Sequence, residues 1–141
     1  MSGAAETPQA TLNPNGSAWV GANAGAGKTY ILVSRLVRLM LDGVAPEKLL
    51  CLTYTRAAAA EMQGRLFDLL AEWTMLDNDA LLDAIAQRLG MTADAKTLAA
   101  ARVLFARALE TPGGLRGANH SRLLRKPAET LPAGGRPVAA F

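Results

Sequence analysis

Hydrophobic residues recur at helical spacing between residues 28 and 42. The apolar positions are Ile31, Leu32, Leu36, Leu39 and Met40. Intervals of three and four residues place these side chains on one face of an α-helix. Arg35 and Arg38 fall on the other face, and Gly43 is suited to end the helix. The pattern therefore predicts an amphipathic helix over residues 28–42.

Two short apolar runs flank this helix. SAWVGA (17–22) and LLCLTY (49–54) have the length and composition of buried strands. Because a helix separates them, we expect the two strands to pair in parallel. We expect Trp19 to pack in the core rather than to serve as a stacking platform. Cys51 is interpreted as a buried strand position, with a catalytic thiol as the lesser alternative, and a lone cysteine forms no internal disulfide.

Further helices are predicted after the second strand. Residues 57–73 and 78–90 are rich in helix formers, and Gly90 is expected to end the second of these helices. Thr92 is expected to cap an Ala-rich helix that runs to about Leu109, with Asp94 and Ala95 in its first turn. These elements predict an α/β fold: an incomplete unit of parallel strands with a crossover helix, plus additional helices.

The two ends of the chain lack this periodicity. Residues 1–16 are polar and are expected to form a flexible N-terminal arm. Residues 117–141 show no helical or strand period, so we expect a disordered C-terminal tail. Residues 1–116 contain 11 Lys and Arg and 11 Asp and Glu, so the net charge of +3 comes entirely from the tail. The basic pI near 9.4 is therefore no argument for nucleic-acid binding by residues 17–116.

The N-terminal sequence and the hydropathy pattern indicate the cellular compartment of the protein. The first residues have no basic start or apolar stretch of a secretory signal, and no apolar run is long enough to span a membrane. We therefore expect a cytoplasmic protein without a membrane partner.

A phosphate-binding loop joins the first strand to the first helix. ANAGAGKT (22–29) fits the pattern G-x-x-x-x-G-K-[ST], with Ala in place of the first Gly. In this pattern backbone N–H groups face phosphate oxygens, Lys28 reaches the β- and γ-phosphates, and the Thr29 hydroxyl ligates Mg²⁺. The cofactors predicted are therefore ATP and Mg²⁺; the alternative is a turn of small residues with an exposed lysine. The predicted nucleotide-binding residues are Ala22, Asn23, Ala24, Gly25, Ala26, Gly27, Lys28 and Thr29.

The second strand and the helix after it narrow the class of protein. LLCLTYTRAAAAEMQGRL (49–66) resembles motif Ia of the UvrD/Rep-type superfamily 1 DNA helicases, T-[FY]-T-[NRK]-x-A-A-x-E-M. The matching positions are Thr53, Tyr54, Thr55, Arg56, Ala58, Ala59, Glu61 and Met62. Within that family, SAWVGANAGAGKT, GVAPEKLLCLTYT and ALETPGG are most similar to the AddA-type helicase–nuclease subunits of double-strand-break repair, in their alphaproteobacterial form.

The resemblance implies a RecA-like P-loop motor domain that couples ATP to movement along single-stranded DNA. It implies single-strand contacts at Tyr54, Thr55 and Arg56, through base stacking and phosphate binding. The alternative is that Thr55 only caps the next helix and that Tyr54 lies in the core. Gln9 is the one candidate for the family's adenine-binding glutamine. For the full-length protein, the resemblance also implies an AddB-type partner subunit.

The tail departs from the family pattern after ETPGGL. Relatives continue into motif Ib, a strand and helix containing T-I-H-A-F, whereas this chain continues with GANHSRLLRKPAETLPAGGRP. Permissible codons for the printed residues give the motif Ib pattern when one G is removed at Arg116–Gly117. We therefore expect residues 117–141 to be an out-of-frame translation. On that hypothesis His120 is not the motif Ib histidine, and the basic residues at 122–126 are no DNA-binding patch.

Several parts of a complete motor are not found in the sequence. The chain has no Asp-Glu pair after an apolar strand to hold Mg²⁺ and orient water, and no later arginines for the transition state. We therefore expect an N-terminal ATP-binding fragment of a DNA helicase that neither hydrolyses ATP nor unwinds DNA. Two alternatives stay open: a non-enzymatic adaptor that binds DNA or a partner, and a small P-loop nucleotide kinase.

Overall fold

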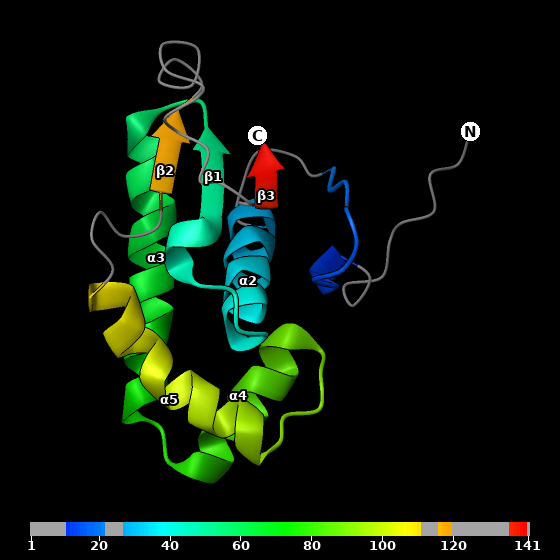
Figure 1. Cartoon of the computed structure of the whole chain (residues 1–141), viewed down its shortest axis with the longest axis vertical. Helices are drawn as coiled ribbons and strands as arrows, with labels where there is room; N and C mark the ends of the chain where they lie inside the picture. The colour runs from blue at the N-terminus through cyan, green and yellow to red at the C-terminus, as the bar shows by residue number, and fades with distance from the viewer. Residues whose placement is uncertain (1–10, 22–26, 111–115, 120–135, 141) are drawn as a thin grey trace.

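The computed structural model describes residues 11–21, 27–110, 116–119 and 136–140, the last two ranges through their backbone. Four helices and a small parallel sheet make up most of this part (Figure 1). Helices α2 (Gly27–Leu41) and α3 (Arg56–Met75) lie against the sheet, while α4 (Asn78–Leu89) and α5 (Ala95–Glu110) lie at the end of the molecule away from the strand tips. A short 3-10 helix, η1 (Pro46–Lys48), precedes the central strand β1 (Leu49–Thr53).

Glycines in the left-handed conformation end helices α2 and α4. Gly43, at a φ of 93°, donates its N–H to the Met40 carbonyl, and Val44 donates to the Leu39 carbonyl, which ends α2 in a Schellman motif. Gly90, at a φ of 59°, ends α4 in the left-handed conformation. The predicted helices over 28–42, 57–73 and 78–90 are therefore confirmed to within two residues.

The start of α5 differs from the prediction. The helix begins at Ala95, and Asp94 is its cap: the Thr97 N–H donates to Asp94 Oδ1 at 2.8 Å, as does the Thr97 hydroxyl. These hydrogen bonds hold the pKa of Asp94 below its ordinary value. The side chain of a cap accepts an N–H from two or three residues later in the chain. Asp94 meets this requirement through the Thr97 N–H, so Asp94 is the cap and Thr92 is not.

The sheet has the order β2-β1-β3, with both neighbours parallel to β1. β2 (Arg116–Asn119) pairs with Leu50 to Thr53, and β3 (Arg136–Ala140) pairs with Leu49 to Leu52 through a register shift at Leu50/Cys51. The predicted tail, residues 117–141, was expected to lack strands, and its described backbone at 117–119 and 136–140 departs from that expectation. Both edges of a central strand carry backbone donors and acceptors, so segments with no side-chain period can still pair there.

The first predicted strand is also absent from the described residues. Residues 17–21 have no regular structure, and the second edge of β1 is occupied by β3 instead. Trp19 is 88% exposed, so the prediction that it packs in the core is wrong. An apolar run identifies a buried strand only if an open sheet edge accepts it, and both edges of β1 are already paired.

A single hydrophobic cluster joins α2, β1 and the three following helices. Leu36, Cys51, Leu66 and Ile85 are fully buried in it. Cys51 is confirmed as a buried strand position, and burial raises the pKa of its thiol to about 12. A thiol that stays protonated at neutral pH is a poor nucleophile, which argues against the catalytic alternative.

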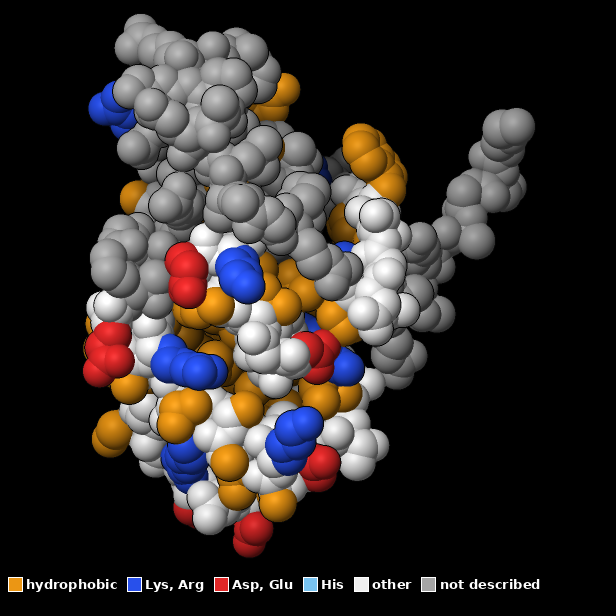
Figure 2. Space-filling model, in the orientation of Figure 1, with side chains coloured by type: hydrophobic (Ala, Val, Ile, Leu, Met, Phe, Trp, Pro, Cys, Tyr) orange, Lys and Arg blue, Asp and Glu red, His pale blue; other side chains and the backbone are white. Residues whose placement is uncertain are grey.

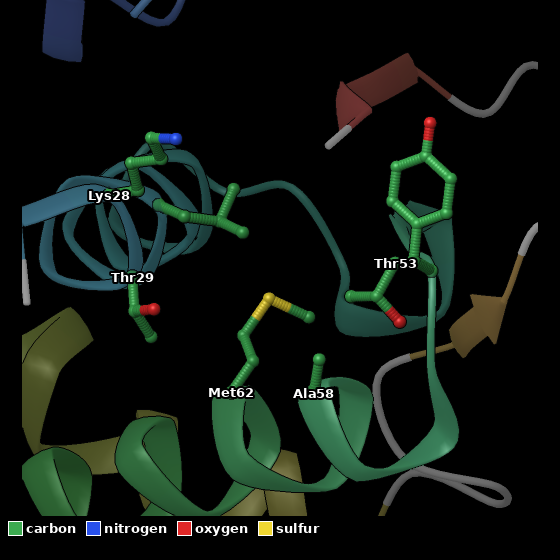
Figure 3. Close-up of a pocket in the computed structure, with 7 residues that line it drawn as sticks. Lys28, Thr29, Thr53, Ala58 and Met62 are labelled. Carbon is green, nitrogen blue, oxygen red and sulfur yellow. The ribbon is translucent and has the colours of Figure 1, made fainter. Parts of the chain in front are cut away.

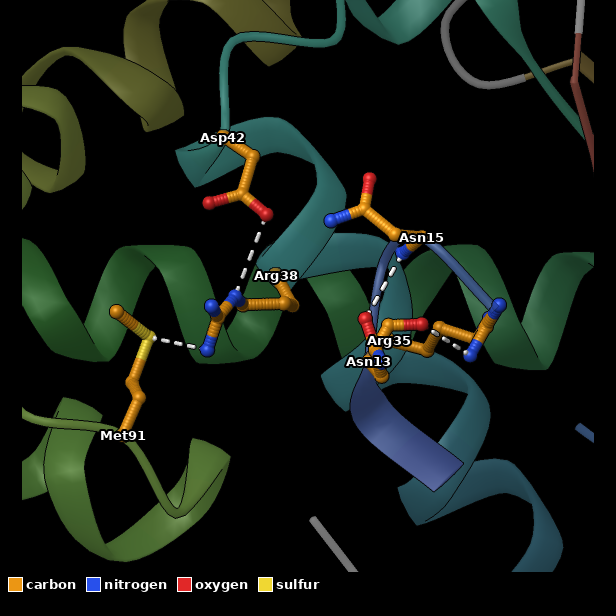
Figure 4. A network of polar contacts seen from close by, with 6 residues as sticks. All are labelled: Asn13, Asn15, Arg35, Arg38, Asp42 and Met91. Atoms are coloured by element: carbon orange, nitrogen blue, oxygen red, sulfur yellow. Dashed lines mark hydrogen bonds and ion pairs between the residues drawn. The ribbon is translucent and has the colours of Figure 1, made fainter. Parts of the chain in front are cut away.

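The surface of α2 that faces away from this cluster is covered by polar contacts (Figure 4). The Arg35 guanidinium donates to the carbonyl oxygens of Thr11, Asn13 and Gly16, so residues 11–16 of the predicted flexible arm lie against α2. Arg38 pairs with Asp42 at 3.3 Å and contacts Met91 Sδ at 2.9 Å. Figure 2 shows that acidic and basic side chains alternate over the described helical part of one face, consistent with the balanced charge of residues 1–116.

Candidate functional site

A pocket of about 260 Å³ lies between the start of α2, the end of β1 and the first turns of α3. Its lining residues are Lys28, Thr29, Leu32, Thr53, Tyr54, Ala58 and Met62. Figure 3 shows Lys28 and Thr29 at the start of α2, with Ala58 and Met62 rising from α3 toward the same space. The structure thus brings residues of the predicted phosphate loop and of the motif Ia-like stretch to one place.

The described part of the loop consists of its last three residues, Gly27 to Thr29. They form the start of α2, where the first N–H groups of a helix have no acceptor within the helix and the helix dipole favours an anion. Lys28 and Thr29 are half-buried and line the pocket. Residues 22–26, and the predicted adenine ligand Gln9, lie outside the described residues.

The opposite wall is built by the junction between β1 and α3. The Thr53 hydroxyl donates to the Thr55 carbonyl at 2.8 Å, and the Thr55 hydroxyl accepts from the Ala58 N–H at 3.0 Å. Thr55 therefore caps α3. A cap does not exclude a contact with DNA, so the predicted role of Thr55 stays a prediction. The two hydrogen bonds fix the corner that sets where Ala58 and the following turn enter the pocket.

Two residues predicted to contact DNA project from this corner into solvent. Tyr54 is 77% exposed, so the alternative that it is a core residue is wrong. Arg56 is the first residue of α3 and is also exposed. Both residues flank Thr55 in the chain, and Tyr54 also lines the pocket. His120 and the basic residues at 122–126 lie outside the described residues.

Sequence reasoning missed three features in and near this region. The pocket wall is largely apolar, because Leu32, Ala58 and Met62 face it beside the polar groups. The position of Thr53 at the carboxyl end of a parallel strand could have placed it here, since ligands of α/β sheets bind beside that end. Tyr30 is held over Arg88 of α4, a contact that no local pattern signals.

The described part of the chain shows neither a cluster of the usual metal-ligating side chains nor a helix suited to cross a membrane. Within it, no group of three or more His, Cys, Asp or Glu side chains is placed to hold a metal ion. No helix among the described residues is both long and apolar enough to cross a membrane.

Comparison with known proteins identifies relatives of the chain. A profile of the UvrD/REP helicase N-terminal domain matches residues 4–105. The chain is similar to an ATP-dependent helicase/nuclease subunit from Clostridium botulinum (strain Okra / Type B1), with 44% identity over 77 residues. That match covers 52% of this chain and 6% of the relative.

Relatives from other bacteria carry the same name. The protein of Leuconostoc mesenteroides is 53% identical over 47 residues, covering 33% of this chain and 4% of its own length. The protein of Heliobacterium modesticaldum is 48% identical over 58 residues, covering 41% of this chain and 4% of its own length. The chain thus spans only 4% to 6% of the length of these relatives. No solved structure matches it.

Proposed function

The chain belongs to the UvrD/REP helicase N-terminal domain family, and from this premise we propose that it is the nucleotide-binding part of an ATP-dependent DNA helicase with a RecA-like fold. One observation carries the proposal: Lys28 and Thr29, at the start of α2, share a pocket with Thr53 at the carboxyl end of β1. Nucleotides bind to parallel α/β sheets at this place, beside the strand ends and a helix N-terminus.

The residues of the pocket fit ATP with Mg²⁺. Lys28 would bind the β- and γ-phosphate oxygens, and the Thr29 hydroxyl would ligate Mg²⁺, which neutralises phosphate charge when bound. A volume of about 260 Å³ suits the phosphate end of a nucleotide better than the whole molecule. The loop residues 22–27 and Gln9 keep their predicted roles toward the phosphates and the adenine.

Single-stranded DNA is the proposed second ligand. The Tyr54 ring is exposed and has the chemistry to stack on a base, and the Arg56 guanidinium and Thr55 hydroxyl suit phosphates. Because Tyr54 also lines the pocket, the same residue would contact both the nucleotide and the DNA. From the resemblance to AddA-type proteins, we propose that the full-length protein acts in double-strand-break repair with an AddB-type partner subunit.

We further propose that this chain binds ATP without multiple turnover. None of the described residues that line the pocket is acidic. Phosphoryl transfer to water requires an acidic group to hold Mg²⁺ and to position the attacking water, as well as a cation for the transition state. The purified chain is therefore expected to bind ADP and ATP while releasing no phosphate beyond one equivalent.

The test is Mg²⁺-dependent binding of a fluorescent ADP analogue to the full chain and to Lys28→Ala. Loss of the Lys28 ammonium group should weaken binding about tenfold or more, because charge-assisted hydrogen bonds to phosphate are stronger than hydrogen bonds between neutral groups. Lys48→Ala is the matched control: Lys48 is an exposed lysine in η1, before the opposite end of β1, and its variant should bind as the unsubstituted chain does. Equal binding by Lys28→Ala and the unsubstituted chain would contradict the proposal.

The same variant separates the helicase proposal from an adaptor. Binding of single-stranded DNA that is indifferent to nucleotide and to Lys28→Ala would favour a non-enzymatic adaptor. Sustained phosphate release by the purified chain would show that the chain needs no further acidic or arginine motif for turnover.

A further inference from the structure

The first turn of α2 carries two polar side chains of the pocket, yet it is the least buried part of that helix. Residues 27–30 are half-buried or exposed, and full burial begins at Leu32. The first N–H groups of a helix lack acceptors within the helix, so terminal turns fray unless other groups hold them. The orientation of Lys28 and Thr29 therefore depends on what anchors this turn.

Two contacts converge on Tyr30, the residue that follows Thr29. The Ser34 hydroxyl, fully buried, donates to the Tyr30 carbonyl at 2.8 Å. The guanidinium carbon of Arg88, from α4, lies 4.2 Å from the centre of the Tyr30 ring. The Ser34 contact lies within α2, whereas the Arg88 contact joins the Tyr30 side chain to α4. Tyr30 therefore links the exposed turn to the packed part of the molecule through its ring.

One buried atom of the Arg88 guanidinium lacks a hydrogen bond within the described part of the chain. Its Nε atom is buried and has no hydrogen-bond partner among the described residues. Burial lowers the pKa of Arg88, while electrostatic interactions with Tyr30 and Glu72 oppose that shift. A partly desolvated guanidinium over an aromatic face gains more than one in free solvent. The Tyr30 ring and the Glu72 carboxylate of α3 are thus the groups that stabilise this cation.

We propose that Arg88 is a positioning residue of the nucleotide site: by holding Tyr30, it keeps the first turn of α2 ordered, with Lys28 and Thr29 directed to the pocket. This inference rests on the proposed function. Without the contact, the turn would have to be ordered when the nucleotide binds, and that cost would appear as lower affinity. Helix α4, which contributes no residue to the pocket lining, thereby influences the affinity for phosphate.

The experiment measures the dissociation constant of a fluorescent ADP analogue with Mg²⁺ for the full chain and its variants, well below the unfolding temperature. Arg88→Met and Tyr30→Leu should each raise the dissociation constant about fivefold. The double variant should be no weaker than either single one, because the two residues act through one contact. Arg88→Lys and Tyr30→Phe keep a cation and a ring, and should restore most of the affinity.

Arg102→Met is the matched control for a purely structural effect. Arg102 of α5 is also half-buried, and it donates to Asn78 Oδ1 at 2.8 Å and to the Trp73 carbonyl at 3.3 Å, neither of which belongs to α2. Its loss should lower the unfolding midpoint without changing nucleotide affinity.

The outcomes distinguish the positioning role from the nucleotide site itself. If the unsubstituted chain binds but Arg88→Met and Tyr30→Leu bind within twofold of it, or if their effects simply add, the positioning role is refuted and the nucleotide site stands. If Arg102→Met weakens binding as much as Arg88→Met, the effect is one of general stability and the proposal is again refuted. If the unsubstituted chain shows no Mg²⁺-dependent binding, the proposed function itself fails.

Discussion

Replacing Thr55 by Ala tests whether this residue acts first as a helix cap. The Thr55 hydroxyl accepts the Ala58 N–H at 3.0 Å, and the backbone of Thr55 has the extended conformation of a cap, with φ −123° and ψ 155°. Because Thr55 is exposed, its replacement removes little packing, and the loss is mainly that of one capping hydrogen bond. Such a loss costs about 1 kcal/mol of unfolding free energy.

The assay is urea and thermal unfolding, followed by far-ultraviolet circular dichroism and by tryptophan fluorescence. A loss of about 1 kcal/mol should lower the thermal midpoint by roughly 4 °C in a domain of this size. Thr55→Ser keeps the acceptor and should be close to the unsubstituted chain, and Thr55→Gly should lose only a few tenths of a kcal/mol, on the order expected for a glycine cap.

Thr74→Ala on the same helix is the control. The Thr74 hydroxyl donates back to the Ala71 carbonyl at 2.6 Å, near the end of α3, and such a contact within a helix contributes little to its stability. Thr74→Ala should therefore not destabilise the protein, because Ala also has the higher helix propensity. If Thr55→Ala is as stable as the unsubstituted chain, or if Thr55→Ser is as unstable as Thr55→Ala, the capping argument is wrong.

Three other predictions follow from the burial pattern and from the sequence. Cys51 should resist a thiol reagent at pH 8 until the protein unfolds, and rapid labelling of the native chain would contradict its burial. The free energy of unfolding should fall as the pH rises from about 9 toward about 12, because only the thiol of the unfolded chain ionises in that interval. Acrylamide should quench Trp19, 88% exposed, but not Trp73, 2% exposed, so Trp19→Phe should abolish most of the quenching and Trp73→Phe should not. Re-sequencing of the gene should find a run of G at codons 116–117, and deletion of one G should open a frame encoding T-I-H-A-F; the absence of such a frame would refute the out-of-frame hypothesis.

Local features of this protein were predictable because they are encoded over a few residues. The helical period of α2, the left-handed glycine at Gly90 and the buried run around Cys51 each follow from the preferences of neighbouring residues. The predicted cap of α5 lay two residues too early. Thr92 and Asp94 both suit a cap, and only the geometry of the first turn distinguishes them.

The placement of the candidate site was predictable only in part. The pattern ending in Lys28 and Thr29 marks a phosphate loop by itself, because few other structures need that spacing of residues. That Met62 would face the same pocket required the crossing of α3 over the start of α2. The contact between Tyr30 and Arg88 joins residues 58 positions apart, and neither residue carries a local sign of it.

Sequence alone determined the helices and the central strand β1, because periodicity and capping act between near neighbours, and it alone suggested the phosphate loop. Tertiary structure decided which segments pair with β1. Residues 17–21 have the apolar composition of a strand and do not form one, whereas residues 116–119 and 136–140 lack a strand pattern and do. Sheet pairing is made by backbone hydrogen bonds between segments distant in the chain, so side-chain pattern alone cannot choose the partner.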